Sequence, residues 1–598
     1  MKMGYYIVME KNKKLIFGII FAVIIVGAFF ARTYEFKDWL YFKMDQGRDA
    51  QLISHAVNEG AAMLPLLGPR AGATDVDNGF LRLGPIYYYF QYLSGVIFNS
   101  TSPEVFAYPD LFFSMLAIIL LYYFARLYFS QNISLLIMAM YAFSFLIIEY
   151  SRFAWNPNPL QFFVLLTFFA LLKFFNAQEN RAKLGWLALW SLALAIGSQL
   201  HFFGFFVLVG VSGLCILLRS EFWKKENLAI ILSKNYFKKI AAYALVFVAV
   251  FSFIYTPVIV SDVMRKGENS KNFIQALSSK PTDKPFVDKV VKNFTENTKY
   301  YTIITTSFFT VGKAENSLMS VIFTLALLVI GVFLTIRALG KEQERIKKDF
   351  LVLLFVWIGI FFILTIPVSF QLRPRFFILV FAIPFILAGI IFDFFQEKFP
   401  QRATYLITIV FVIIFGSNVY GTLAWFGEQK NSQIKDVEVD RTIILKTKDG
   451  VTLGQLQKAV DFMYAERKEQ NMVYYYVKPE HTQPIKYLLN QKNDLSLQFA
   501  TLGSTPTVNP NAQFFAIIPS HTKLNSLESK FDQKFKELSF ENVGQISVYE
   551  INFSDRVTSK DFRINKKFEA TDRLFWKDVF GMEKEIDEEG MDEVNMNE

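Results

Sequence analysis

Two aspartates and an arginine in the segment FKMDQGRDAQ, residues 42–51, have the types and spacing for acid–base chemistry. If the segment is helical, Asp45, Arg48 and Asp49 lie at positions i, i+3 and i+4 and share one face. One carboxylate could then act as a base while the guanidinium binds an anion or holds the second carboxylate. The pattern also fits an ordinary helix start, with Asp45 as the N-cap and an exposed ion pair beside it.

A second polar group is EYSRFAWNPNP, residues 149–159, which follows a long apolar stretch. Glu149 and Arg152 lie one helical turn apart, and the prolines force the chain to leave the helix after them. An acid near a membrane boundary is costly unless it is paired, so these two residues could form a structural ion pair. In the functional interpretation this segment brings a second acid, Glu149, and the amides of Asn156 and Asn158 to the same outer surface as Asp45.

Arginines form a third group in QLRPRFF, residues 371–377. Arg373 and Arg375 beside an apolar wall suit a phosphate whose lipid tail stays in the bilayer, because guanidinium groups bind phosphate oxygens in pairs. The alternative is that both arginines extend to lipid headgroups. Arg48 and Arg82 are further candidates for the same anion.

His201 stands in QLHFFG, at the expected turn between the spans 184–199 and 202–218. A single His among aromatic residues more often packs than binds a ligand. With four His and one Cys in the chain, those residue types build no metal motif. A divalent cation, Mg²⁺ or Mn²⁺, could still bind the carboxylates of Asp45 and Asp49.

The elements that position these residues are expected to be apolar helices. The chain has 598 residues, is 53% hydrophobic and contains 67 Phe. Its apolar runs have the length that crosses a bilayer as a helix, so we expect a mainly α polytopic membrane protein with about eleven spans. The expected spans are 15–31, 106–128, 132–149, 159–175, 184–199, 202–218, 241–261, 317–336, 350–366, 375–394 and 404–424.

Lys and Arg are frequent in the short loops that share a side with the N-terminus, which predicts that this side is cytoplasmic. The first long loop, residues 32–105, then lies outside, as do residues 262–316 and everything after about 425. Within the first long loop, residues 80–98 favour an interfacial or re-entrant helix. Many of the basic residues lie in these short loops, so membrane topology accounts for the net charge of +9. We therefore expect no nucleic-acid partner.

After Trp425 the composition becomes that of a soluble α/β or α+β domain, which we place at residues 428–582 after a membrane domain of residues 1–427. Strands are expected in RTIILKTKDGVTL, MVYYYVKP, AQFFAIIPS and GQISVYEINF, and helices in LGQLQKAVDFMYAERKEQ and LNSLESKFDQKFKEL. Lys448-Asp449-Gly450 fits a tight turn. The acidic tail, residues 583–598, is expected to be disordered.

These motifs together resemble the GT-C membrane glycosyltransferases, in particular the dolichyl-phosphate-mannose-protein mannosyltransferase-like group, which includes the lipid A aminoarabinose transferases. The resemblance rests on an acid after the first span, LGPIYYYF closing the first long loop, an acid and a turn after the third span, QLHFFG, and RPRFF late in the bundle. It covers roughly residues 10–425.

The resemblance implies a GT-C bundle that transfers a sugar from a polyprenyl phosphate to an acceptor hydroxyl on a glycan, lipid or protein, with inversion. It gives Asp45 the role of general base, with Asp49 as the neighbouring acid. Because family members usually have adjacent acids, whereas here three residues intervene, the base stays open between Asp45 and Asp49. The donor phosphate would be bound by Arg373 and Arg375, and these cations could suffice without a metal. The acceptor or the sugar would be bound by Glu149, Arg152, Asn156, Asn158 and His201.

A transporter or flippase for lipid-linked or anionic solutes is the competing class. Such proteins place ionisable groups and broken helices near the bilayer midplane, often in repeated halves. Here the ionisable groups gather at the expected outer boundary, and the sequence contains no visible repeat. The sequence also lacks a phosphate-binding P-loop, which argues against ATP-driven transport. A noncatalytic assembly protein for the cell envelope is a third possibility.

Overall fold

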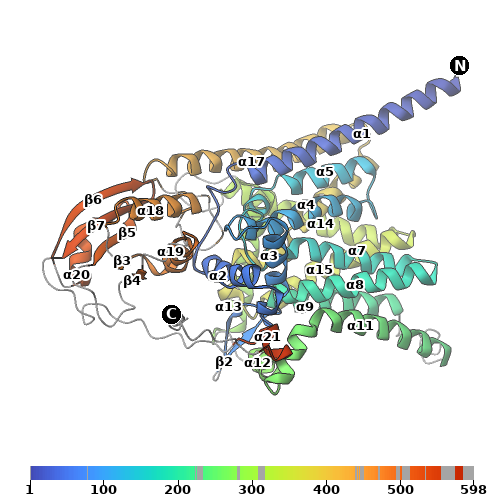
Figure 1. Ribbon diagram of the computed structural model, residues 1–598. Coiled ribbons are helices and arrows are strands. Elements are labelled where there is room, and N and C mark those ends of the chain that lie inside the picture. Colours follow the sequence, from blue (N-terminus) through green and yellow to red (C-terminus); the bar gives the residue numbers. More distant parts are fainter. Residues whose placement is uncertain are drawn as a thin grey trace.

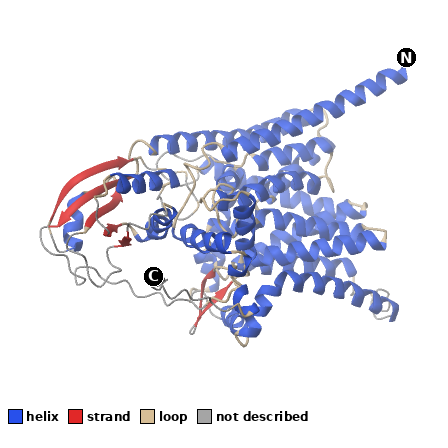
Figure 2. Cartoon of the chain, in the orientation of Figure 1, coloured by secondary structure: helices blue, strands red, loops and turns tan. Residues whose placement is uncertain are grey.

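The computed structural model describes most of the chain. The described residues are 2–76, 79–221, 224, 234–278, 283–307, 317–437, 439, 441, 444, 450–468, 472–492, 498–501, 512–531, 534–553 and 573–582. Figure 1 shows a bundle of long helices at one end of the molecule and a sheet at the other, and Figure 2 shows that strands are nearly confined to the second part.

Seven helical segments in the described part are long and apolar enough to cross a membrane. They lie in α1 (Lys2–Thr33), α4 (Tyr108–Ala125), α9 (Phe202–Ser220), α11 (Lys234–Met264), α14 (Leu318–Lys341), α15 (Arg345–Thr365) and α17 (Ala403–Ser432). The short helix η4 (Pro374–Val380) and α16 (Ile383–Lys398) form an eighth if the pair, bent by 40°, is one span.

All eleven expected spans are helical, but length and composition support seven, or up to eight, rather than eleven. The other segments are α5 (Gln131–Ala142) with α6 (Phe145–Glu149), α7 (Leu160–Asn176) and α8 (Asn180–Leu200). The expected span at 132–149 is broken between α5 and α6, and α7 is one residue short of the eighteen required for a span. The expected break between α8 and α9 is confirmed, and it falls at His201.

The first long loop folds into a layer over one end of the bundle. It contains α2 (Met44–Glu59), η1 (Ala61–Met63), the antiparallel strands β1 (Arg70–Val76) and β2 (Gly79–Arg82), α3 (Ile86–Ile97) and η2 (Val105–Ala107). Two helices from residues 262–316 join this layer, α12 (Glu268–Ser278) and α13 (Phe286–Thr305). Helix α2 contains Asp45 and Asp49, so the helical form of this segment is confirmed.

The C-terminal part contains a five-stranded mixed sheet in the order β4-β3-β5-β7-β6. The strands are β3 (Met472–Tyr476), β4 (Gln498–Thr501), β5 (Gln513–Pro519), β6 (Phe535–Val543) and β7 (Ile546–Phe553). Strand β3 runs parallel to both β4 and β5, whereas β7 is antiparallel to β5 and β6. Helices α18 (Leu453–Ala465) and α19 (Pro479–Gln491) connect and cover these strands.

Most of the expected C-terminal elements are confirmed, namely α18, β3, β5 and β7. The helix expected over 524–538 is wrong in its second half: η5 (Leu524–Leu527) and α20 (Glu528–Phe531) give way to β6. Strand pairing overrides the helical pattern in this segment. Gly544, at φ 72°, begins a two-residue turn that joins β6 to β7, and this turn lets β6 pair with β7 along its length. Most of the strand and turn expected at 441–450, and the acidic tail, lie outside the described residues.

Helix α19 packs directly on α2, and a glycine makes this close contact possible. A Cβ atom on Gly47 would lie 2.6 Å from the backbone nitrogen of Pro484. At one end of this contact Tyr487 donates a hydrogen bond to the carbonyl of Thr101. The main hydrophobic core runs without a break from the bundle into the C-terminal part, so the sheet domain and the first long loop pack as one body.

Candidate active site

Helix α2 holds its two aspartates together through the arginine between them. Arg48 donates hydrogen bonds to Oδ1 of Asp45 at 3.0 Å and to Oδ1 of Asp49 at 3.0 and 2.8 Å. The Asp45 side chain is 52% exposed, whereas that of Asp49 is 7% exposed. The spacing i, i+3, i+4 therefore yields one accessible carboxylate and one buried carboxylate that share a single cation.

Asp49 is also held from the neighbouring helix. The hydroxyl of Tyr88, on α3, donates to Oδ1 of Asp49 at 2.9 Å. Burial raises the pKa of Asp49 above its ordinary value, although Arg48 opposes this shift. Burial lowers the pKa of Arg48, but Asp49, Tyr88 and Asp45 outweigh it, so the pKa of Arg48 is raised. These contacts fix the geometry of α2 relative to α3.

Further arginines from separate segments surround Tyr88. Burial, together with the nearby cations Arg573, Arg70 and Arg48, lowers the pKa of Arg82 to about 9, although Tyr88 opposes this shift. The side chain of Arg82 has one long hydrogen bond, from NH1 to the carbonyl of Gly68 at 3.4 Å. Like charges that crowd a partly buried guanidinium are relieved when an anion binds, so this group is a candidate anion site.

Arg375 approaches the same carboxylates from the bundle. Its electrostatic neighbours are Tyr150, Asp45 and Arg373, and its guanidinium lies 5.5 Å from the ring centre of Trp155. The Nε atom of Arg375 is buried and has no hydrogen-bond partner. Arg373 also lies near Tyr300 on α13. Of the two arginines of RPRFF, Arg375 is the one that has Asp45 among its electrostatic neighbours.

His201 caps a helix rather than presenting a charge. Its Nδ1 accepts a hydrogen bond from the backbone N–H of Phe203 at 3.2 Å, at the start of α9. Burial, with a smaller effect of Arg375, lowers the pKa of His201 to about 3. The imidazole is thus neutral at physiological pH, and its ring packs edge-on against Phe376.

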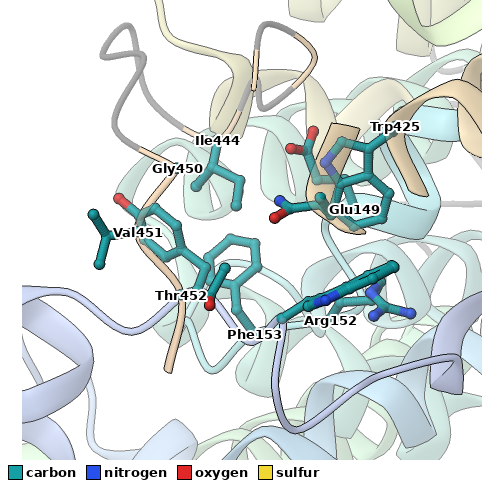
Figure 3. Close-up of a pocket in the computed structure, with 11 residues that line it drawn as sticks. Glu149, Arg152, Phe153, Trp425, Ile444, Gly450, Val451 and Thr452 are labelled. Atoms are coloured by element: carbon teal, nitrogen blue, oxygen red, sulfur yellow. The ribbon is translucent and has the colours of Figure 1, made fainter. Parts of the chain in front are cut away.

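Glu149 and Arg152 lie in a pocket that does not include Asp45. The pocket encloses about 330 Å³ of empty space, part of it open to solvent, between the α6–α7 turn, α17 and the start of α18 (Figure 3). Arg152 donates to the carbonyls of Ala31 at 3.2 Å and Tyr34 at 2.6 Å. Arg152 is therefore held by the backbone at the end of α1, and Asp45 does not line this pocket.

The two turn amides have structural partners. Asn156 donates to the carbonyl of Leu200 at 2.7 Å, which ties this turn to the α8–α9 hairpin. Asn158 is buried and donates to the carbonyl of Phe153 at 2.8 Å. Both amides thereby fix the path of the turn that carries Trp155 toward Arg375.

Asp110, which the sequence analysis did not single out, is a fully buried acid close to this turn. Its carboxylate accepts a hydrogen bond from Tyr87 at 2.9 Å and one from the backbone N–H of Trp155 at 3.4 Å. It thereby links α3 to the turn between α6 and α7. The sequence did contain a signal for Asp110. It is an acid near the start of an expected span, and an acid in that position requires polar partners.

Tyr88 and Arg573 are the other residues that sequence reasoning missed. Tyr88 was one aromatic among four in the run YYYF, and the run by itself does not show which ring turns toward an acid. Arg573 lies far along the chain, in the expected C-terminal domain, yet its guanidinium is 5.9 Å from the ring centre of Tyr88. Tertiary packing alone brings it to the first long loop.

The donor set at Asp45 and Asp49 does not fit a divalent cation as the side chains stand. The guanidinium of Arg48 contacts an oxygen of each carboxylate, in the place where a bridging cation would bind. Across the described segments, there is no group of three or more His, Cys, Asp or Glu residues that could hold a metal ion. We therefore derive no step through a metal.

Comparison with protein families gives one match. Residues 74–264 match the family model described as dolichyl-phosphate-mannose-protein mannosyltransferase. The resemblance drawn from the sequence motifs is confirmed over these residues, and the match supports a membrane glycosyltransferase. The matched residues include Arg82, Tyr88, Asp110 and Glu149, but they begin after α2. No curated protein is similar enough in sequence to be matched.

Among solved structures, the oligosaccharyltransferase AglB from Archaeoglobus fulgidus, in complex with an inhibitory peptide and a dolichol-phosphate, is 12% identical, with a TM-score of 0.47 over 92% of this chain and 75% of that chain. ArnT from Cupriavidus metallidurans in the apo state is 11% identical, with a TM-score of 0.48 over 93% of this chain and 99% of that chain. ArnT bound to undecaprenyl phosphate is 11% identical, with a TM-score of 0.43 over 89% of this chain and 97% of that chain.

Proposed function

We propose that this chain, whose residues 74–264 match the mannosyltransferase family model, is an inverting glycosyltransferase of the cytoplasmic membrane. It moves a sugar from a polyprenyl-phosphate donor to a hydroxyl on a glycan, lipid or protein of the cell envelope, on the outer side. One observation carries the proposal: the accessible carboxylate of Asp45 is paired with Arg48 and has a second cation, Arg375, as an electrostatic neighbour.

Asp45 is the general base in this proposal. As the acceptor oxygen attacks the anomeric carbon, its proton passes to a carboxylate oxygen of Asp45. The bond between that carbon and the donor phosphate oxygen breaks on the opposite side, so the configuration inverts. Asp49 is too buried to meet an acceptor directly, and instead it orients Arg48 and, through Arg48, Asp45.

The donor phosphate leaves as an anion and needs positive charge that is already in place. Arg375 and Arg82 are the described guanidiniums best suited to this, because Arg375 has a buried N–H without a partner and Arg82 has one long hydrogen bond to a carbonyl. Bidentate guanidinium contacts suit phosphate oxygens. A lipid phosphate stabilised in this way is a good leaving group without a metal.

A transfer assay tests the proposal. Purified protein in nanodiscs is supplied with a panel of radiolabelled hexosyl and pentosyl undecaprenyl phosphates and with a cell-envelope extract as the source of acceptors. We expect label to move to the extract while undecaprenyl phosphate is released, and the anomeric configuration of the product, read by NMR, to be opposite to that of the donor. Movement of an intact donor across a vesicle membrane without transfer would instead indicate a flippase.

A further inference from the structure

The last described segment of the chain lies on the first long loop instead of on the C-terminal sheet. We call residues 573–582 the strap, and it includes α21 (Trp576–Phe580). The backbone N–H of Leu66 donates to the carbonyl of Leu574 at 2.8 Å, and that of Trp576 donates to the carbonyl of Leu64 at 3.1 Å. Figure 1 shows α21 at the helix bundle, apart from strands β3 to β7.

A tryptophan anchors the strap by its side chain. The indole N–H of Trp576 donates to the hydroxyl of Tyr89 at 2.9 Å, and this hydroxyl donates to the carbonyl of Pro65 at 3.1 Å. Trp576 also packs against the main hydrophobic core. Backbone pairing, a partly buried hydrogen-bond relay and apolar contact are therefore combined in one short segment, which makes the contact specific.

The strap carries Arg573 to the candidate anion site. Its guanidinium lies 5.9 Å from the ring centre of Tyr88, the residue that donates to Asp49. Within the described part of the chain, Arg573 makes no hydrogen bond or ion pair, and its electrostatic neighbours include the cation Arg82 and the carboxylate of Asp49. Asp49 is already bound by Arg48 and Tyr88. The repulsion between Arg573 and Arg82 would therefore be relieved by an anion that binds both guanidiniums.

We propose that the strap completes the donor site by bringing Arg573 beside Arg82, so that both guanidiniums bind the donor phosphate. The inference rests on the proposed function, because the phosphate is that of the lipid-linked sugar. It adds a residue from the far end of the chain to a site that is otherwise built by the first long loop and the bundle. The C-terminal part then has a direct role in donor binding.

Docking of the strap can be measured without any substrate. Pro65 and Phe575 face each other as antiparallel bridge partners, a geometry that brings Cα atoms to about 4.5–5.5 Å, within reach of a disulfide. In a Cys215→Ser background, Pro65→Cys with Phe575→Cys should cross-link under mild oxidation, as read by mass spectrometry of the digested protein. The matched control is Pro65→Cys with Phe580→Cys, which should not cross-link. Failure of the first pair to cross-link overturns the docked strap.

The role of Arg573 is measured by equilibrium binding to full-length protein in nanodiscs. The probes are undecaprenyl phosphate and undecaprenol, which has the same tail without the phosphate. Arg573→Ala should weaken binding of undecaprenyl phosphate about tenfold, the effect of losing one hydrogen-bonded charge, and leave undecaprenol unchanged. Arg573→Lys should restore part of the loss. Lys577→Ala removes a charge from the same strap at a residue that does not face the site. This variant should change the binding of neither probe.

The outcomes separate the two proposals. If wild-type protein prefers undecaprenyl phosphate over undecaprenol while Arg573→Ala has no effect on this preference, the inference is overturned and the proposed function stands. If the wild type has no preference for the phosphate, the proposed function itself is overturned. Removal of residues 573–598 is a second variant that should match Arg573→Ala in its loss of phosphate preference.

Discussion

Tyr88 donates a hydrogen bond of 2.9 Å to Oδ1 of Asp49, and this contact joins helix α3 to helix α2. Asp49 in turn accepts from Arg48, whose other arm holds Asp45. The accessible carboxylate is therefore at the end of a chain of contacts that begins on a different helix. Asp45 and Asp49 consequently have different environments, although their spacing on α2 makes them look equivalent in the sequence.

The two aspartates should differ when each is mutated. Asp45→Asn removes the accessible base and should lower the rate of transfer by about 10²–10⁴-fold, with normal folding. Asp49→Asn leaves the half-buried Arg48 beside a neutral group and should lower the free energy of unfolding by about 1–3 kcal/mol. Transfer rates and thermal unfolding of both variants measure this. Normal transfer by Asp45→Asn together with inactive but stable Asp49→Asn would reverse the two assignments.

Removal of the Tyr88 hydroxyl should change the pH dependence of the reaction. The hydroxyl stabilises the charged form of Asp49, so Tyr88→Phe should raise the pKa of that carboxyl beyond its already raised value. If the ionised carboxylate is needed to hold Arg48, the acidic limb of the rate profile moves to higher pH. The rate of transfer measured from pH 4 to pH 8 shows this, with Tyr92→Phe on the same helix as the control. An unchanged profile would mean that Asp49 does not titrate in this range.

Stability should also depend on the titration of Asp49. Because its folded pKa is raised, the folded protein binds more protons than the unfolded chain in the interval between the ordinary value of about 3.9 and the raised value. Its contribution therefore favours folding at the acid end and is lost as pH rises through this interval. The free energy of unfolding of the wild type should therefore approach that of Asp49→Asn as pH rises, because only the wild type loses this contribution. Parallel curves would contradict the raised pKa.

Gly47 should be intolerant of a side chain. A Cβ there would lie 2.6 Å from the nitrogen of Pro484 and 2.8 Å from the carbonyl carbon of Gln483, and both are backbone atoms that cannot turn aside. We expect Gly47→Ala to lower the free energy of unfolding by about 1–3 kcal/mol, since α19 must move away from α2. Gly185→Ala on α8 has open space around it and serves as the control. Equal unfolding temperatures for the two variants would argue against this close packing.

Mutation of the two arginines of RPRFF should have different effects on the KM for the lipid-phosphate donor. Arg375 faces Asp45, and its buried Nε has no partner, so Arg375→Ala should raise the KM for the lipid-phosphate donor about tenfold or more. Arg373, whose contact is with Tyr300, should have a smaller effect. Steady-state kinetics with varied donor measures both. An unchanged KM in Arg375→Ala would point to a role at the lipid headgroups instead.

The sequence by itself determined the parts whose signals are local. Apolar runs of span length are helical in all eleven expected places, the spacing of Asp45, Arg48 and Asp49 gave one helix face, and His201 marked the break between α8 and α9. These features follow from hydrophobic periodicity and short-range sterics, which act between neighbouring residues. The segment 524–538 shows the limit, because pairing with β7 overrides its helical pattern beyond α20.

Tertiary structure alone decided which distant residues meet. It buried Asp49 under Tyr88, turned Arg152 to the carbonyls of Ala31 and Tyr34 instead of toward Asp45, and brought Arg573 beside Tyr88. No local pattern contains this information, because contacts between residues hundreds of positions apart depend on how whole elements pack and on which buried polar groups must find partners. The sequence thus supplied the reactive groups, and packing decided which of them share a site.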